Sequence, residues 1–455
     1  MATFTASGAL LTNGDYYGTL AAVRDLGKQG IPIWLADSGA TQAAASRYVR
    51  HHLPCPDRHQ SFSALNQVGD WLIELGQRHP GLVLYPTSDD MAWIMAVRQN
   101  DLQAHYRLFQ APERAVFRLL NKASLYQTAA AHGLPAPATY YPDSPDSLNA
   151  IAARLTSEAG FPVIVKPKTQ IGMRTNVKGL VARDATELIT HVQTFLDQHS
   201  YQPALLAYAP EIRWPMVQAY LPQAASQTYT VAGFIDRHGD LLGVRASFKV
   251  LQQPVQIGIG VAFEGRPVLQ RLTHKILKLA HAVGYFGVFE TEFIYLAEQD
   301  QYLLMDFNPR YYGQMNFEIQ RGLALPRMVY AAAYGDQTTL SQLAAQAAQT
   351  QLPLITTEIT PRLDAPEIRQ GDHARQRYCA GWLFRFLLRA QQASGRISAA
   401  QRQQWLDWIA ESAAQGQAFD AIHDPNDPAP ERRDKWLLCK KFLRHPRSSY
   451  RQHFL

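Results

Sequence analysis

The 455-residue chain has little cysteine and no long apolar run. Its three cysteines, Cys55, Cys379 and Cys439, lie far apart, which excludes a disulfide framework and the closely spaced cysteine pairs of a zinc site. No run approaches the roughly 18 apolar residues of a membrane-spanning helix. The opening residues, MATFTASGALLTNGDYYG, lack the basic and apolar segments of a secretory signal. These absences predict a cytoplasmic protein with no membrane span.

A strong excess of one charge is also missing. The chain contains 44 lysines and arginines against 38 aspartates and glutamates, a formal net charge of +6. This mild and dispersed excess lacks the basic stripe of a nucleic-acid-binding protein, so we expect no nucleic-acid partner, although small anions remain suitable ligands. The composition, 47% hydrophobic and 18% charged, is that of a globular protein, and the length suits roughly three domains.

The first region, residues 1–120, reads as strands alternating with helices. Strands are expected at 8–12, 31–37 and 81–90, with a helix at 17–30 and another from about residue 91. This alternation predicts an α/β, Rossmann-like parallel layer. The first loop, NGDYYG, has no G-x-G-x-x-G motif, which counts against a nicotinamide-dependent oxidoreductase. Asp89 and Asp90 follow the third strand, where they fit either a ligand site or a helix N-cap.

The second region, residues 121–335, has the pattern of an α+β unit. It opens with a helix over 122–132 and a proline-rich stretch over 135–145 that marks a boundary. Strand patterns then predominate, broken by helical periodicity at 185–199 and 268–284. The expected strands cover 161–168, 214–222, 228–236, 241–250, 287–296 and the apolar residues from 303 onward. The last two, joined by AEQDQ, are predicted to form an antiparallel hairpin.

The third region, residues 336–455, is rich in alanine, glutamine and arginine and is expected to be mostly helical. Its end, from Glu431 onward, is basic and amphipathic. One interpretation packs Trp436, Leu437 and Phe442 inward and leaves the lysines in water. The alternative is peripheral contact with an anionic membrane surface.

The stretch LLMDFNPRYYGQ, residues 303–314, places polar side chains directly after an apolar strand. Asp306, Asn308 and Arg310 alternate, so an extended backbone puts all three on one face. A carboxylate and an amide oxygen suit magnesium, and an arginine beside them suits a phosphate. A polar turn in which Asp306 caps a neighbouring loop is the competing interpretation.

The preceding strand supports the metal interpretation. Glu292 lies fourteen and sixteen positions before Asp306 and Asn308, so hairpin pairing can bring these side chains together. Glu290 shares the face of Glu292. Lys166, at the end of a buried strand, and Lys249, which follows Arg245 on another, add cations for phosphate groups. The combination favours nucleotide chemistry.

These motifs resemble those of the ATP-grasp ligases, which fold two α+β halves around MgATP. The matching stretches occur in the family's order over residues 120–315: NKASLYQTAAAHGLPAPATY, FPVIVKP, MVQAYLP, GYFGVFETEF and LLMDFNPRYYG. The later stretch AFDAIHDPNDPAPERRDKW is similar to the end of a subgroup that includes D-aspartate ligase-like carboxylate–amine ligases.

The resemblance implies an ATP-grasp fold between an N-terminal Rossmann-like layer and a C-terminal helical extension, with a hinge near 214–222. It implies ATP and Mg2+ as cofactors, with Mn2+ as an alternative metal. By resemblance, the metal ligands are Glu292, Asp306 and Asn308, and the ATP phosphates contact Lys122 and Lys166. The hinge that binds adenine is Gln218, Ala219, Tyr220 and Leu221, and the ribose lies near Thr228. The transferred phosphoryl group contacts Arg310, Lys249 and Arg245.

Three positions depart from the family pattern. Asp306 replaces the usual glutamate and shortens the arm to the metal. Ala219 replaces a glutamate of the hinge, and Thr228 stands where an acid normally holds the ribose hydroxyls.

The resemblance implies an ATP-dependent carboxylate–amine ligase that forms an amide or peptide bond through an acyl phosphate, with small-molecule acid and amine substrates, one of them an amino acid. Asp89 or Glu290 is a hypothetical proton acceptor for the amine. The alternative is an ATP-grasp protein that binds a nucleotide without ligating anything. A homodimer is compatible with this fold.

Overall fold

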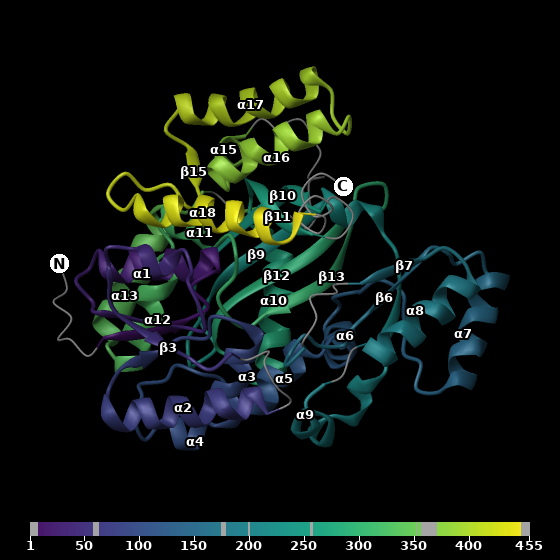
Figure 1. Cartoon of the computed structure of the whole chain (residues 1–455), viewed down its shortest axis with the longest axis horizontal. Helices are drawn as coiled ribbons and strands as arrows, with labels where there is room; N and C mark the ends of the chain where they lie inside the picture. The colour runs from purple at the N-terminus through teal and green to yellow at the C-terminus, as the bar shows by residue number, and fades with distance from the viewer. Residues whose placement is uncertain are drawn as a thin grey trace.

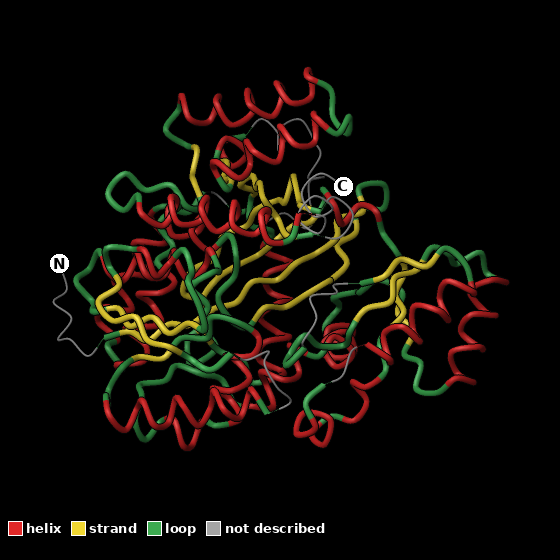
Figure 2. Tube along the Cα trace, in the orientation of Figure 1, coloured by secondary structure: helices red, strands yellow, loops and turns green. Residues whose placement is uncertain are grey.

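The computed structural model describes residues 8–57, 63–173, 179–198, 201–254, 258–352, 354–355 and 371–446. Within these residues the chain forms three sheets, which Figure 2 shows as an N-terminal sheet on the left, a large sheet in the centre and a small sheet on the right. The predicted mixture of α/β and α+β units is confirmed. Domain boundaries at residues 120 and 335 stay predictions.

The N-terminal sheet is parallel and has the strand order β3-β2-β1-β4. Helix α1 (Tyr17–Gly27) follows β1, and α2 (Ala64–Arg78) and α3 (Asp89–Val97) follow later strands. The parallel α/β layer is as predicted, and all four residues of β1 are buried, which is typical of a sheet covered on both faces. The strands are β1 (Ala9–Thr12), β2 (Ile33–Asp37), β3 (Val49–Pro54) and β4 (Val83–Leu84).

The small sheet has the strand order β5-β8-β6-β7 and is antiparallel. Helices α7 (Pro145–Ser157) and α8 (Ala185–Gln198) lie together at the right of Figure 1 and pack on it through a core that includes Leu148, Val163 and Val192. Its strands are β5 (Thr139–Tyr140), β6 (Val163–Lys166), β7 (Leu180–Ala182) and β8 (Met216–Ala219).

The large sheet has seven strands in the order β13-β12-β9-β10-β11-β14-β15. The predicted hairpin of β12 and β13 is confirmed and lies at one edge. Three strands of this sheet were not predicted: β11 and the two short strands of the C-terminal region, β14 and β15. The strands are β9 (Thr228–Ile235), β10 (Leu241–Gln253), β11 (Ile259–Arg266), β12 (Gly287–Leu296), β13 (Gln301–Asn308), β14 (Arg377–Cys379) and β15 (Ala418–Asp420).

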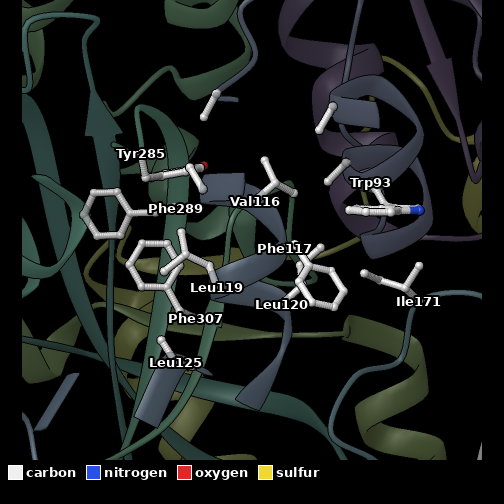
Figure 3. Close-up of a cluster of buried hydrophobic side chains, with 14 of the residues drawn as sticks. Trp93, Val116, Phe117, Leu119, Leu120, Leu125, Ile171, Tyr285, Phe289 and Phe307 are labelled. Atoms are coloured by element: carbon white, nitrogen blue, oxygen red, sulfur yellow. The ribbon is translucent and has the colours of Figure 1, made fainter. Parts of the chain in front are cut away.

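A packed core fixes the back of the hairpin. Helix α5 (Glu113–Leu120) inserts between α3 and the large sheet, and Figure 3 shows its apolar side chains between Trp93 on one side and Phe289 and Phe307 on the other. Phe289 and Phe307 are fully buried. Because side chains alternate along a strand, burying these two rings turns Glu290 and Asn308 to the opposite face.

The remaining helices complete the layers around the sheets. Helices α4 and α6 lie between the N-terminal sheet and the small sheet in the chain, and α9 lies between β7 and β8 of the small sheet. Helix α10 covers the large sheet, and α11 to α13 pack against α1 and β10. Their bounds are α4 (Gln99–Leu102), α6 (Lys122–Ala131), α9 (Pro203–Tyr208), α10 (Gln270–Val283), α11 (Met315–Gln320), α12 (Leu325–Tyr334) and α13 (Gln337–Gln349).

The C-terminal region is mostly helical, as expected, but β14 and β15 also join it to the large sheet. Its last helix, α18, crosses between the α16–α17 pair and α1 (Figure 1). Among the described residues no helix is both long and apolar enough to span a bilayer. The helices are α15 (Asp372–Arg375), α16 (Gly381–Ala393), α17 (Ala399–Ala414) and α18 (Ala429–Arg444).

Helix α18 departs in part from the expected inward packing. Phe442 contacts the ring of Phe386, with centroids 6.1 Å apart, but Trp436 is 48% exposed. Arg433 and Lys440 cover the Trp436 ring instead, because their cationic groups are attracted to its π face. The amphipathic pattern therefore correctly placed Phe442 and wrongly placed Trp436.

Candidate active site

A cavity of about 560 Å³ lies where the three sheets and the C-terminal helices meet. Its walls come from the small sheet, the face of β9, β10, β12 and β13 opposite the aromatic core, the loop after β1, and α18. The predicted site residues that line it are Lys122, Lys166, Gln218, Ala219, Tyr220, Leu221, Thr228, Lys249, Glu292, Asp306, Asn308 and Arg310.

The hairpin brings the expected metal ligands together. Glu292 pairs with Asp306 across the strands, and Glu290 pairs with Asn308. The register shifts between Glu292 and the next pair, so Met305 is an extra residue, and it also lines the cavity. Such a bulge redirects side chains near a sheet edge. The pattern of alternation predicted the pairing but gave no sign of the bulge.

Glu290 holds Asn308 in a fixed orientation. The carboxylate is 1% exposed, and its two oxygens accept hydrogen bonds from Asn308 Nδ2 at 2.5 Å and from Gln314 Nε2 at 2.8 Å. Because the Asn308 nitrogen faces Glu290, its Oδ1 is left for another partner. Burial and the charge of Glu292 raise the pKa of Glu290 to about 8, although both amide donors oppose this. This arrangement fits a positioning role better than the hypothetical role of proton acceptor.

Lys122 and Asp306 form an ion pair inside the cavity. Lys122 Nζ lies 2.7 Å from Asp306 Oδ1. Burial alone would lower the pKa of Lys122, but the Asp306 carboxylate holds it above its usual value. Burial would likewise raise the pKa of Asp306, yet Lys122, Arg310 and Lys166 hold it below its usual value. Both groups are therefore charged at neutral pH.

Lys166 is held by the small sheet. Its Nζ donates to Gln218 Oε1 at 3.3 Å, and Gln218 Nε2 in turn donates to Thr139 Oγ1 at 3.0 Å and the Tyr126 hydroxyl at 3.3 Å. Burial and the neighbouring charge of Lys122 lower the pKa of Lys166 to about 8. The Gln218 side chain therefore aims Lys166 into the cavity.

One backbone amide of the expected hinge has no hydrogen-bond acceptor among the described residues. Ala219 N donates to Ala138 O and Tyr220 N donates to Pro162 O, so both amides serve the small sheet. The next amide, at Leu221, has no acceptor among the described residues and lies at the cavity wall. The Thr228 hydroxyl donates to Ala224 O at 3.0 Å, which leaves its oxygen lone pairs as acceptors.

Arg310 faces the cavity but is paired with the N-terminal layer. Its Nε lies 2.6 Å from Asp89 Oδ1, and the carboxylate raises the pKa of Arg310. Asp89 is thus committed to Arg310, which weakens the hypothesis that it accepts a proton from a substrate. The N-cap interpretation of Asp89 and Asp90 is wrong, because Ser88 caps α3 through the Met91 amide.

The two basic residues of β10 have different surroundings. Lys249 is 7% exposed and lines the cavity; burial lowers its pKa, and the charges of Glu292 and Glu290 oppose the effect. Arg245 does not line the cavity, so its assignment to the phosphoryl site is wrong. Its guanidinium donates to Arg321 O and Ala347 O, each at 2.9 Å. Both residues lie on one face of β10, but α11 and α13 cover that face at Arg245.

Sequence patterns missed two groups of lining residues. The loop after β1 contributes Tyr16, and the first turn of α1 contributes Tyr17. Gly18, in the same turn, allows close packing, since a Cβ there would collide with the carbonyl oxygen of Tyr312. The C-terminal region contributes Tyr378 and Asp434. The tyrosines of NGDYYG were a visible signal, but nothing in the sequence linked them to residues more than 350 positions away.

The oxygen atoms at the hairpin suit a divalent cation. Among the described residues no group of three or more His, Cys, Asp and Glu forms a metal cluster. The hairpin instead offers two carboxylates and an amide oxygen. Glu292 has no hydrogen-bond partner among the described residues, and Asn308 Oδ1 is oriented by Glu290. All three donors are hard oxygens, so the site fits Mg2+ or Mn2+ in kind.

Comparison with known proteins finds similar folds among solved structures. No protein-family model matches the sequence, and no curated protein does either. Solved structures match well: the biotin carboxylase domain of a Hydrogenobacter thermophilus 2-oxoglutarate carboxylase, described with MgADP and bicarbonate, is 14% identical with a TM-score of 0.54, covering 74% of this chain and 70% of that one.

Two further structures match over similar lengths. A biotin carboxylase from Campylobacter jejuni is 15% identical, with a TM-score of 0.53 over 72% of this chain and 71% of that one. An L-amino acid ligase from Bacillus licheniformis is 12% identical, with a TM-score of 0.52 over 74% and 77%. These proteins share the ATP-grasp fold, and the likeness shows that this chain has it too.

Proposed function

We propose that this chain is an ATP-dependent carboxylate–amine ligase. One observation carries the proposal: a hairpin sets Glu292, Asp306 and Asn308 on one wall of a cavity whose other walls present Lys122 and Lys166. Hard oxygen donors opposite lysines suit a nucleotide phosphate with its metal. The L-amino acid ligase among the structural neighbours supports an amino acid as one substrate.

Each part of the cavity has a role in this proposal. Glu292, Asp306 and Asn308 would hold Mg2+ or Mn2+, and Lys122 and Lys166 would bind the ATP phosphates. The Leu221 amide and the hinge carbonyls would bind adenine, with Thr228 beside the ribose. When bound, MgATP would supply the phosphoryl group that activates a substrate carboxylate as an acyl phosphate.

The chain's own residues would then position the substrates and neutralise the negative charge of the phosphoryl group. Arg310, fixed by Asp89, and Lys249 point positive charge into the cavity, where it opposes the negative charge of a phosphoryl group in transfer. No protein nucleophile is needed, so catalysis rests on orientation and charge.

Ligation is tested by the dependence of ADP release on two substrates. The purified protein is incubated with MgATP and a panel of amino acids, singly and in pairs, and ADP and the amide product are measured. We expect ADP release to require both an acid and an amine. If the protein binds nucleotide but releases no ADP with any pair of amino acids, the result would favour the alternative, a nucleotide-binding protein that ligates nothing.

Lys166 predicts a pH dependence of nucleotide affinity. With a pKa of about 8, Lys166 is charged below that pH and loses its charge above it. Affinity for MgATP should be full below pH 8 and fall as pH rises through it, by at most about tenfold per pH unit for one proton. In Lys166→Arg, which stays charged, affinity should fall less steeply over this range, and the change that remains would come from other groups such as Glu290, whose pKa is also about 8. Equal slopes in both proteins, measured by titration calorimetry, would contradict this role.

A further inference from the structure

The cavity reaches the carboxyl edge of the N-terminal sheet, where Tyr16 and Gln42 line it. In the strand order β3-β2-β1-β4 the chain passes from β1 to β2 and β3 on one side and returns to β4 on the other. The loops after β1 and β4 therefore diverge here, and open α/β sheets bind their ligands at such a switch point. The hydroxyls of Thr12 and Thr87, 2.6 Å apart, join the ends of the two strands.

Two contacts fix Arg310 at the same edge of the sheet. Its Nε lies 2.6 Å from Oδ1 of Asp89, in the first turn of α3, and Tyr311 N donates to Pro86 O at 2.9 Å, in the loop after β4. The arginine that we place beside the transferred phosphoryl group therefore lies at the switch point. An acid substrate that is activated beside Arg310 would lie against the loop after β1.

The Tyr16 hydroxyl lies beside these groups without a partner. It forms no hydrogen bond with any described residue, and a Cβ built on Gly313 would lie 3.7 Å from its oxygen. Gly313 comes three positions after Arg310, so the phenol packs against the segment that carries this arginine. The charges of Arg310, Glu290 and Asp89 all act on the phenol, which also shows that it is close to them.

Gln42 is a second polar side chain of this edge that lacks a partner. It is 3% exposed, and its side-chain amide bonds to no residue in the described part of the chain. Gly14 O accepts from Ala43 N at 2.9 Å, which ties the loop after β2 to the loop after β1. Because buried polar groups are nearly always hydrogen-bonded, two free ones from adjoining loops indicate a place for a polar ligand.

The groups around Tyr16 favour an anionic ligand. Burial raises the pKa of the phenol, so its hydroxyl keeps its proton and can donate, as does the guanidinium of Arg310. Three acids lie in the same region of the cavity lining. Both oxygens of Glu290 already accept from amide groups, Glu292 belongs to the proposed metal site, and Asp15 is exposed to water. A carboxylate between Tyr16 and Arg310 would receive two donors.

We propose that Tyr16 contacts the acid substrate and that its hydroxyl donates a hydrogen bond to the carboxylate that becomes activated beside Arg310. This assignment rests on the proposed ligase function. It makes the loop after β1 part of the substrate site, so the N-terminal layer takes part in recognising the acid.

The test compares a free acid with its carboxamide in matched variants. The full chain is mixed with magnesium, a non-hydrolysable ATP analogue and each of the common L-amino acids or its carboxamide, and affinities are taken from the thermal midpoint. Tyr16→Phe removes only the hydroxyl. Tyr48→Phe removes a hydroxyl from a half-buried tyrosine just before β3, outside the cavity lining.

We expect at least one free amino acid to stabilise the wild type and Tyr48→Phe much more than its carboxamide does. Tyr16→Phe should bind that amino acid roughly 10- to 100-fold more weakly, because it loses a hydrogen bond to a charged acceptor, whereas binding of the carboxamide should change less. The preference for the acid therefore shrinks in Tyr16→Phe alone. An unchanged nucleotide-dependent shift shows that this variant is folded.

Other results overturn the inference. An unchanged preference for the acid in Tyr16→Phe would show that the hydroxyl does not bind the carboxylate. Loss of the nucleotide shift in Tyr16→Phe alone would place the hydroxyl on a phosphate instead. A nucleotide shift without any amino-acid effect in the wild type would refute this inference and leave the nucleotide site of the ligase proposal standing. Absence of the nucleotide shift in the wild type would overturn both.

Discussion

Replacing Asp306 and Asn308 with alanine together is expected to lower ATP turnover at least roughly 100-fold, because metal coordination contributes several kcal/mol to phosphoryl transfer. The pair supplies a carboxylate and the oriented amide oxygen of the hairpin. Their loss leaves Glu292 as the one remaining member of the proposed donor set. The measurement is magnesium-dependent ADP release at saturating ATP.

The control for this variant lies in the same hairpin. Glu298 is exposed in the turn between β12 and β13, outside the cavity, and Glu298→Ala should keep full turnover. Circular dichroism of both variants shows whether the protein is folded. Undiminished turnover in the folded Asp306→Ala, Asn308→Ala protein would contradict the metal assignment.

Replacing Arg24 with methionine is expected to lower the free energy of unfolding by about 3–5 kcal/mol, the cost of breaking a buried ion pair from one side. Arg24 Nε lies 2.9 Å from Asp427 Oδ2, with side chains 5% and 1% exposed. The guanidinium also donates to the Ile422 and Asp427 carbonyls, each at 2.8 Å. These bonds tie the segment before α18 to α1. The variant leaves the carboxylate and both carbonyl oxygens without their hydrogen-bond donor.

A matched control lies one helical turn further along α1. Lys28 Nζ pairs with Asp424 at 2.8 Å, but Lys28 is 46% exposed. Because solvent screens such a pair, Lys28→Met should change stability by less than about 1 kcal/mol. Denaturant unfolding of the two variants measures the difference. Similar losses in both would show that the buried pair does not anchor the C-terminal region.

Local patterns were sufficient for the parts of the site that one hairpin builds. Period-two alternation placed Asp306 and Asn308 on one face, and the short connection predicted pairing with the strand of Glu292, as the register confirms. The same reasoning failed for Arg245. It lies on the same face of β10 as Lys249, but alternation cannot tell which part of a strand face another helix will cover.

Contacts between distant segments could not be predicted from local patterns. Strand β11 carries three glycines within or just before it, which weaken its strand propensity, and β14 and β15 have three residues each. Asp434 lies on a helix whose pattern indicated only an amphipathic surface. The Arg24–Asp427 pair, which ties the segment before that helix to α1, joins residues 403 positions apart.

The central claim is a metal–nucleotide site at the β12–β13 hairpin, and the most direct test is binding of ATP with and without magnesium. Binding to the folded state raises the unfolding midpoint according to RT ln(1 + [L]/Kd). We predict a clear rise with ATP and magnesium, a much smaller one when a chelator removes the metal, and none with NAD. Equal midpoints with and without ATP, in magnesium, would contradict the account.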